Sequence, residues 1–221
     1  MPQKVALITG SVRTPRVGPD VADWVASILP QDNNKDGIEI ERVAIADFKL
    51  PVFDEFVIPA MVPTYAQFQH EHSKKWSDAI RSFAGYIFVT PEYNAGVPGG
   101  VKNAIDYLYS EWPGKPAAVI SYGMQGGIRA NEQLAYTLEM IMKLKVVEPR
   151  VEMAFSGGSG QPDSIAASTQ GKLGDDTKKE WTENGNKEKV LRAFEALSQI
   201  VKEQATEEKV AKAATADGAA E

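Results

Sequence analysis

Three short stretches of this sequence bring together side chains that suit a flat ligand carrying a phosphate group. The first stretch, residues 10–18, contains the hydroxyl of Ser11 and the guanidinium groups of Arg13 and Arg16, directly ahead of an expected helix. The free N–H groups and the dipole of a helix N-terminus attract anions, and an arginine fork matches the oxygens of phosphate. We interpret this loop as a phosphate site; the alternative is a solvated loop whose arginines bind nothing specific.

The second stretch, residues 91–97, contains an aromatic ring, an amide and a carboxylate. Tyr93 and Asn94 could contact a flat heterocycle by stacking and by hydrogen bonding. Glu92 has the chemistry of a general acid or base, but the sequence supplies neither a partner carboxylate nor a group that would orient it. We therefore expect Glu92 to shape the loop or to accept hydrogen bonds rather than to transfer protons.

The third stretch, residues 121–127, is rich in glycine and follows an expected strand. Glycine lets a backbone approach a ligand closely, although a tight turn alone would also explain it. The two histidines, His70 and His72, stand two residues apart without evident further ligands, so we expect no metal site. No Ser-His-acid set can be assembled either. The sequence thus predicts a binding site with no catalytic acid–base residue.

These stretches must be positioned by alternating strands and helices. Apolar runs predict strands at residues 5–9, 86–89, 117–121 and 146–153, and partial alternation of apolar residues predicts a further strand at 38–45. Apolar stripes predict helices at 19–29, 74–84, 98–109, 128–144 and 190–201. Such an alternation gives a doubly wound α/β fold, with a five-stranded parallel sheet in the order 2-1-3-4-5 and helices on both faces. In this architecture ligands bind past the carboxyl ends of strands 1 and 3, where the first two stretches lie.

Prolines and polar segments predict where the elements end. Because proline lacks the N–H that a central strand needs, we expect the strand at 86–89 to stop before Pro91, and Pro149 to make the fifth strand an edge or bulged strand. Pro98 suits the first position of a helix.

We expect a turn at 31–37, a long loop at 54–73 and a mobile excursion at 156–186. One domain fills residues 1–205, and residues 206–221 form a frayed or disordered tail.

Composition excludes several classes of protein. The chain of 221 residues has a net charge of −6, so it lacks the basic surface that nucleic-acid binding needs. No apolar run approaches the ~18 residues of a membrane span, and the N-terminus does not resemble a signal peptide. The absence of cysteine excludes disulfides and thiolate chemistry and suits a reducing compartment. We therefore expect a cytoplasmic protein with no nucleic-acid or membrane partner.

Three segments together resemble the NADPH-dependent FMN reductase family, whose members are flavodoxin-like. The segments are GSVRTPR, TPEYNAGVPGGVKNAIDYLYSEWPGKP and SYGMQGGIRANEQL; the similarity runs from about residue 5 to residue 144, and residues 190–201 are consistent with the closing helix. The nearest likeness is to fungal-type FMN and quinone reductases. The resemblance implies tightly but non-covalently bound FMN, NADPH or NADH as hydride donor, and quinones, azo compounds or free flavin as acceptors. It also implies a homodimer or a dimer of dimers.

The resemblance assigns residues to each part of FMN. The phosphate would be held by Ser11, Arg13, Arg16 and Val17. The isoalloxazine ring and the ribityl chain would face Pro91, Glu92, Tyr93, Asn94 and Ala95. The pyrimidine end of the flavin would be approached by Tyr122 and Gly123, with Gly126 and Gly127 behind them. No catalytic side chain is implied, because the flavin supplies the redox chemistry. The segment 156–186 departs from the compact pattern of the family.

Two other functions stay open at this point. One is a non-enzymatic electron carrier of the flavodoxin type; such carriers hold the phosphate with a Thr/Ser-rich loop, so Arg13 and Arg16 argue against it. The other is an interaction protein that responds to the redox state of its FMN. For the expected homodimer, an apolar partner surface is offered by Phe56, Val57, Ile58, Met61 and Tyr65, unless that loop folds back on its own domain.

Overall fold

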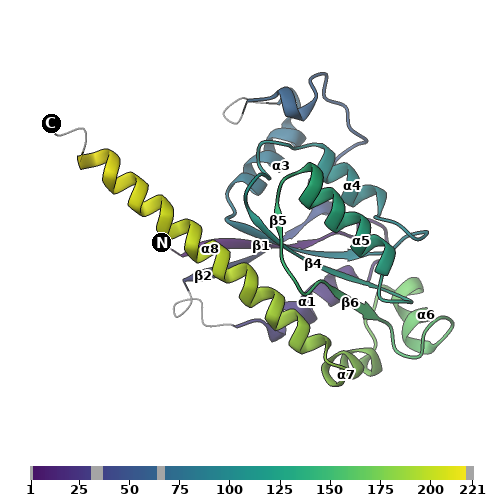
Figure 1. Cartoon of the computed structure of the whole chain (residues 1–221). Coiled ribbons are helices and arrows are strands. Elements are labelled where there is room, and N and C mark those ends of the chain that lie inside the picture. Colours follow the sequence, from purple (N-terminus) through teal and green to yellow (C-terminus); the bar gives the residue numbers. More distant parts are fainter. Residues whose placement is uncertain (1, 31–36, 64–67, 218–221) are drawn as a thin grey trace.

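The computed structural model describes residues 2–30, 37–63 and 68–217, and a parallel sheet forms their centre (Figure 1). Its strands run in the order β2-β1-β3-β4-β5, and a further strand, β6, also pairs with β4. The bounds are β1 Gln3–Thr9, β2 Ile38–Ala44, β3 Gly85–Pro91, β4 Pro116–Gly123, β5 Lys145–Val146 and β6 Val151–Ala154. The predicted order 2-1-3-4-5 is confirmed. All but one residue of the turn predicted at 31–37 lie outside the described residues.

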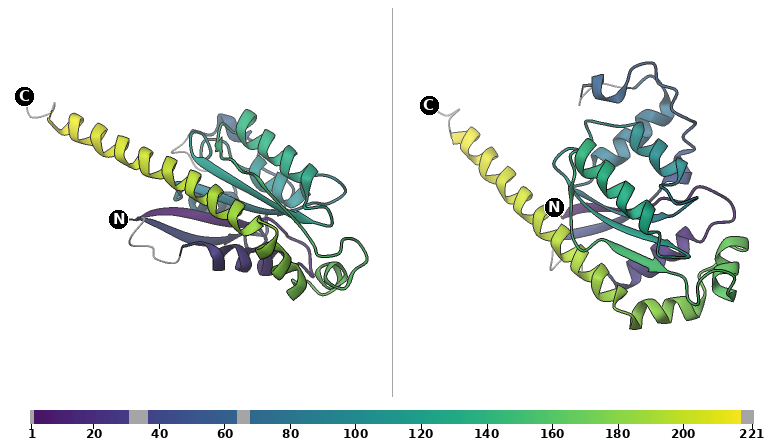
Figure 2. Two further views of the ribbon diagram at one scale, coloured as in Figure 1. Left: turned by 60° about the horizontal axis from the view of Figure 1, so that its bottom comes forward. Right: turned by 45° about the vertical axis from the view of Figure 1, so that its right-hand side comes forward.

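Helices cover both faces of the sheet, as Figure 2 shows. Helices α1 Gly18–Ile28 and α8 Asn186–Asp217 pack on one face, and α3 Glu71–Arg81, α4 Gly99–Asp106 and α5 Ile128–Tyr136 pack on the other. Two short 3₁₀ turns, η1 Ile45–Phe48 and η2 Pro59–Met61, lie between β2 and α3. Every residue of β3 is buried, because both faces of a central parallel strand are covered.

The carboxyl ends of β1, β3 and β4 lie side by side. Thr9 pairs with Val89, and Val89 pairs with Ile120. The chain leaves these three strands through residues 10–17, 92–98 and 124–127. The three stretches singled out in the sequence therefore meet at one edge of the sheet.

The central strand is longer than the sequence predicts. Instead of stopping before Pro91, β3 includes it, and Pro91 pairs with Tyr122 of β4. Alternate residues of a parallel strand direct their N–H groups to opposite neighbours. The N–H of Glu92 donates to the Tyr122 carbonyl (3.2 Å), so the Pro91 nitrogen faces the other side, where β1 has already ended at Thr9. The missing N–H therefore costs no hydrogen bond. Pro98 directly precedes α4 instead of opening it.

Two other predicted elements are interrupted. The helix predicted at 128–144 is α-helical only through Tyr136 and continues as a π-helical turn, Thr137–Ile141. The strand predicted at 146–153 is split into β5 and β6 on either side of Pro149, which cannot donate to a neighbouring strand. Both pieces still pair with β4 in parallel.

The segment 156–186 contains regular structure where the sequence predicts a mobile excursion. Its two helices, α6 Pro162–Thr169 and α7 Asp175–Glu183, are called here the α6–α7 hairpin. The hairpin buries Ser164, Ala167, Leu173, Thr177 and Trp181. These side chains are mostly small or polar, so they give no apolar stripe that the sequence alone could reveal.

Helix α8 runs through the segment for which the sequence predicts a frayed or disordered tail. It continues to Asp217 and projects away from the domain (Figure 1). Up to residue 215, where the description of burial ends, Val201 is the last buried residue, and residues 206–215 are all exposed. Ala, Glu and Lys favour helix even without an apolar face to bury. Among the described residues, no helix has both the length and the apolar character needed to cross a membrane.

Candidate functional site

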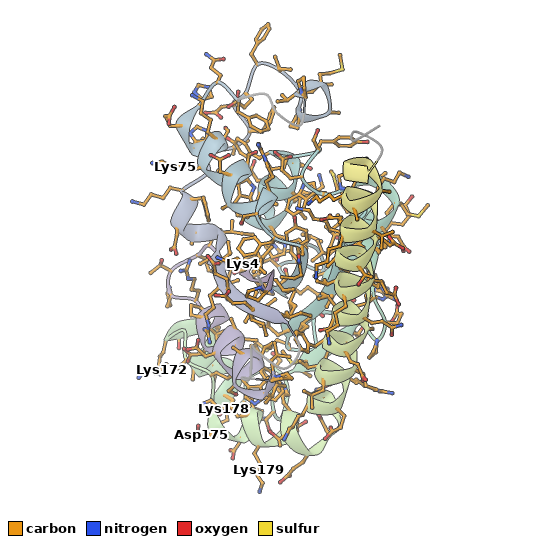
Figure 3. The ribbon with its side chains drawn as sticks, turned by 90° about the vertical axis from the view of Figure 1, so that its left-hand side faces the viewer. Lys4, Lys75, Lys172, Asp175, Lys178 and Lys179 are labelled. Atoms are coloured by element: carbon orange, nitrogen blue, oxygen red, sulfur yellow. The ribbon has the colours of Figure 1, made fainter. Side chains whose placement is uncertain are left out.

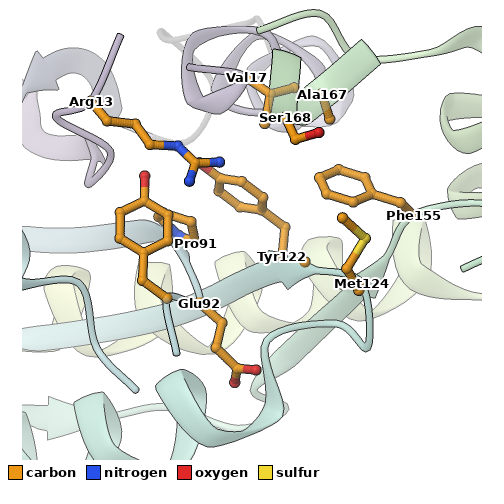
Figure 4. A pocket seen from close by; sticks show the side chains of 11 residues that line it. Arg13, Val17, Pro91, Glu92, Tyr122, Met124, Phe155, Ala167 and Ser168 are labelled. Atoms are coloured by element: carbon orange, nitrogen blue, oxygen red, sulfur yellow. The ribbon is translucent and has the colours of Figure 1, made fainter. Parts of the chain in front are cut away.

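A pocket opens at the carboxyl ends of the central strands, where the three stretches meet (Figure 4). Its volume, including space open to solvent, is about 370 Å³. Its walls are formed by Arg13, Val17, Pro91, Glu92, Tyr93, Tyr122, Gly123, Met124, Phe155, Ala167 and Ser168. The loops after β1, β3 and β4 therefore share one cavity with residues from the end of β6 and from α6.

Two hydroxyl groups are buried next to the first loop. Ser11 Oγ and Tyr122 Oη are buried, and although they approach each other, neither makes a hydrogen bond of acceptable geometry with the described residues. Both lie against Gly18, the first residue of α1: a Cβ there would meet Ser11 Oγ and would lie 2.8 Å from Tyr122 Oη. Burial raises the pKa of the Tyr122 phenol, so it stays protonated. Each hydroxyl can therefore donate to an acceptor at this helix N-terminus.

The rest of the loop presents N–H groups and guanidinium groups. From Ser11 to Val17, no backbone N–H donates to an acceptor in the described part of the chain. Arg16 Nη1 donates to the Ser11 carbonyl (3.1 Å), which closes the loop on itself. Arg13 is exposed, and its guanidinium lies 4.6 Å from the centre of the Tyr93 ring. Such a cation–π contact contributes only about 0.5–1 kcal/mol at an exposed site, so Arg13 can exchange it for an anion.

The second loop is a tight turn that presents Tyr93. Tyr93 and Gly96 exchange two backbone hydrogen bonds of 3.1 Å, and the residues between them, Asn94 and Ala95, have φ angles of 50° and 55°. These values match a type I′ turn, which Asn tolerates well and Ala poorly. The side chain of Gln133 in α5 holds the turn by accepting from the Val97 N–H (3.2 Å). Asn94 and Ala95 thus shape the loop and do not line the pocket.

The carboxylate of Glu92 points away from the centre of the pocket, as Figure 4 shows. Its Oε2 accepts hydrogen bonds from the N–H groups of Arg129 (2.8 Å) and Ala130 (3.0 Å), in the first turn of α5. A negative charge there caps the helix and complements its dipole. Glu92 therefore has the hydrogen-bonding role that the sequence favours over proton transfer.

The glycines of the third loop have two different roles. Gly126 and Gly127 have φ angles of 78° and 74°, and a Cβ on Gly127 would lie 3.1 Å from the backbone nitrogen of Tyr122. These two glycines are needed for the turn itself. Gly123 lines the pocket, and no atom would lie closer than 3.6 Å to a Cβ on it, so its backbone is open to a ligand.

The structure brings only part of the predicted set to the pocket wall. Arg13, Val17, Pro91, Glu92, Tyr93, Tyr122 and Gly123 line it, whereas Ser11, Arg16, Asn94, Ala95, Gly126 and Gly127 shape the loops that carry it. Sequence reasoning misses Met124, Phe155, Ala167 and Ser168. Met124 and Phe155 each follow the end of a strand, so the rule for ligand sites in α/β sheets could have found them. Ala167 and Ser168 carry no such signal.

The two histidines belong to a different part of the surface. Their rings stack at 5.2 Å, and His72 Nε2 lies 2.9 Å from a carboxylate oxygen of Asp54. Within residues 2–30, 37–63 and 68–217, no group of three or more His, Asp or Glu side chains could hold a metal ion.

Known proteins are similar to this chain in sequence and in fold. Residues 3–158 match the family described as NADPH-dependent FMN reductase. The NAD(P)H-dependent FMN reductase ntnL of Nectria sp is 54% identical over 200 residues, which cover 90% of this chain and 98% of the relative. A quinone reductase of Pseudomonas putida is 33% identical over 181 residues, covering 79% and 86%. The solved structure of FerB, a flavoenzyme NAD(P)H:(acceptor) oxidoreductase from Paracoccus denitrificans, aligns with a TM-score of 0.60 over 91% of this chain and 98% of that one; at 22% identity this is a similarity of fold alone.

Proposed function

This chain belongs to the NADPH-dependent FMN reductase family, and we propose that the pocket described above holds the FMN with which it reduces small-molecule acceptors. The chain is an FMN-dependent oxidoreductase that takes its hydride from NADPH or NADH. The acceptors that we propose are quinones, azo compounds or free flavin. Flavin and quinone as acceptors are supported by the names of two relatives, an FMN reductase and a quinone reductase.

The observation that carries the proposal is the set of unused donors at the N-terminus of α1. A phosphate there would accept hydrogen bonds from the Ser11 hydroxyl and from the free N–H groups of the loop. The guanidinium of Arg13 and the helix dipole would add attraction for its charge. The residues present therefore fit the phosphate end of FMN.

The remaining walls suit a flat ring. Tyr93 and Met124 offer a ring face and a polarisable side chain, and Gly123 leaves its backbone accessible. FMN bound in this pocket would supply the redox chemistry between the reduced nicotinamide and the acceptor. The protein holds and orients it. Because the Glu92 carboxylate is engaged with the first turn of α5, we assign no proton transfer to it.

The test is the absorbance spectrum of the purified protein before and after anaerobic addition of NADPH. We expect a yellow flavin spectrum that bleaches directly, and mass spectrometry of the heat-released cofactor should give FMN. A flavin that stays oxidised until another reductase is added would identify an electron carrier of the flavodoxin type. Recovery of FAD alone, or of no flavin, would overturn the proposal.

We further propose that the protein works as a homodimer in the cytoplasm. Support for the dimer comes from the loop before α3, where Phe56 is 93% exposed and Met61 is 71% exposed. Tyr65, which the sequence places in the same surface, lies outside the described residues. Support for the compartment comes from the absence of cysteine, which suits a reducing environment.

A further inference from the structure

The α6–α7 hairpin lies outside the family match and yet closes one side of the pocket. The match ends at residue 158, whereas the two helices span residues 162–183. Ala167 and Ser168 of α6 form a wall beside Phe155, which follows the end of β6 (Figure 4). A segment beyond the matched core therefore contributes to the site.

The turn between the two helices packs closely on the first loop. Gly171 has a φ angle of 69°, and a Cβ there would lie 2.8 Å from the backbone nitrogen and 2.9 Å from the carbonyl oxygen of Arg16. Two residues later, the N–H of Leu173 donates to the carboxylate of Asp20 in the first turn of α1, over 3.0 Å. The turn thus contacts both the loop and the start of the helix that follows it.

The hairpin is anchored well enough to support what it touches. Trp181 is fully buried, and its ring packs edge-on against Trp24 of α1 at 5.2 Å and stacks with Phe155 at 6.3 Å. The N–H of Thr177 donates to the carboxylate of Asp163 over 2.7 Å, which joins α7 to α6. On its outer side the hairpin projects the charged side chains Lys172, Asp175, Lys178 and Lys179 (Figure 3).

The first loop has little structure of its own. Its hydrogen bond within the loop is the one from Arg16 to the Ser11 carbonyl, and its backbone N–H groups from Ser11 to Val17 are unbonded within the described residues. A loop with so few bonds samples several shapes unless another element packs on it. Each additional shape lowers the affinity for a ligand that needs one of them.

We propose that the α6–α7 hairpin braces the first loop in the shape that binds the phosphate of FMN, with Gly171 and Asp20 as positioning residues. The inference rests on the proposed function, because it gives a cause for the affinity of that site. Gly171 permits a backbone contact with Arg16 that a larger residue forbids. Asp20 joins the turn to α1 through its hydrogen bond with the Leu173 N–H. This bond gives a reason for an acidic side chain in the first turn of α1, although its negative charge repels a phosphate bound there.

The first experiment compares two glycine substitutions in the flavin-free protein, using quenching of flavin fluorescence to measure the dissociation constants of FMN and riboflavin. Gly160 has a φ angle of 80° but nothing within 4 Å of a Cβ, so Gly160→Ala imposes similar backbone strain without touching the loop. We expect Gly171→Ala to weaken FMN binding about 10-fold or more, because the loop loses its preorganised shape. Riboflavin, which lacks the phosphate, should bind both variants like the parent.

The second experiment compares two substitutions of Asp20. Asp20→Ala and Asp20→Asn both remove the charge, but only the asparagine keeps an oxygen that can accept the Leu173 N–H. We expect Asp20→Ala to bind FMN about 2- to 13-fold more weakly than Asp20→Asn, the effect of one neutral hydrogen bond. Riboflavin should not distinguish the two variants. If Gly171→Ala fails to fold, this pair decides the question.

The outcomes separate the brace from the proposed function. If the parent protein does not bind FMN, the proposed function fails and the brace fails with it. If the parent binds FMN, but Gly171→Ala matches Gly160→Ala and Asp20→Ala matches Asp20→Asn, only the brace is overturned. Equal losses of FMN and riboflavin affinity would also overturn it, because the hairpin would then support the ring or the whole fold.

Discussion

Arg13 is the side chain best placed to add charge-assisted hydrogen bonds to a phosphate in the pocket. It is exposed, it lines the pocket, and its present contact with the Tyr93 ring is weak. Replacing Arg13 by alanine should weaken FMN binding about 10- to 150-fold, since one such bond contributes roughly 1.5–3 kcal/mol. Fluorescence titration of the flavin-free protein measures this, and riboflavin should bind parent and variant about equally.

Alanine substitutions at two other arginines provide comparisons for the FMN affinity of Arg13→Ala. Arg16→Ala should lie between Arg13→Ala and the parent, because Arg16 holds the Ser11 carbonyl and so affects the shape of the loop. Arg192 is exposed on α8, so Arg192→Ala should bind FMN like the parent. If Arg13→Ala loses riboflavin affinity as strongly as FMN affinity, Arg13 supports the ring or the fold and the phosphate assignment is wrong.

Replacing Ser11 by alanine should have opposite effects on the stability of the protein and on its affinity for FMN. The buried hydroxyl of Ser11 has no partner among the described residues, and an unsatisfied buried polar group costs about 1–3 kcal/mol. Ser11→Ala should therefore raise the free energy of unfolding of the flavin-free protein by about 1 kcal/mol, as urea unfolding would show. The same variant should bind FMN about 10-fold more weakly or worse, because a hydrogen bond to a charged phosphate is lost.

A second buried serine separates the two effects. Ser198 on α8 also has an unpartnered buried hydroxyl, and it does not line the pocket. Ser198→Ala should gain similar stability and leave FMN affinity unchanged. Lower stability of Ser11→Ala would contradict the assignment, since it would mean that the Ser11 hydroxyl is already bonded in the flavin-free protein.

At the scale of elements, the predictable features are those that a local pattern records. The strands β1, β3 and β4 are largely apolar because helices cover both of their faces, and this coverage produces recognisable apolar runs. The end of β3 could not be predicted, since the side that the Pro91 nitrogen faces depends on where β1 ends. The hairpin could not be predicted for a related reason: Trp181 is buried against Trp24 of α1 and Phe155, and the sequence of α7 has no apolar stripe of its own.

The residues of the candidate site also fall into those that the sequence could predict and those that it could not. Arg13, Tyr93 and Tyr122 follow strand ends and have types that suit a phosphate or a ring, so both their place and their chemistry could be predicted. Ala167 and Ser168 have small side chains on a helix far along the chain. Only tertiary packing brings them to the pocket, so their residue types give no warning of it.

The projecting end of α8 should contribute nothing to the stability of the domain. Residues 206–215 are exposed throughout, and surface residues away from special contacts usually change stability by no more than about 0.5 kcal/mol. A chain ending at residue 205 should therefore melt within about 2 °C of the full chain and bind FMN equally well. Thermal unfolding followed by circular dichroism measures this; a larger drop in the melting temperature would mean that the segment packs on the domain or on another copy.

Among the residues that the structure describes, two groups of exposed apolar side chains could each pair two copies of the chain. The first group, on the loop before α3, consists of Val52, Phe56, Val57, Ile58 and Met61. The second, on α5 and the π-helical turn, consists of Tyr136, Met140 and Ile141. The first group contains the most exposed side chain of the two, Phe56 at 93%, and a phenylalanine so fully exposed to water is stabilised when a partner covers it.

We therefore expect light scattering to give twice the chain mass of 24.1 kDa, and Phe56→Glu to shift it to the monomer mass, because a buried unpaired carboxylate opposes association. The matched control is Val210→Glu, which adds the same charge at an exposed valine on the projecting end of α8 and should leave a dimer. Met140→Glu tests the second group. A monomer for Met140→Glu together with a dimer for Phe56→Glu would move the interface to α5, and a parent that is monomeric across micromolar concentrations would refute the dimer.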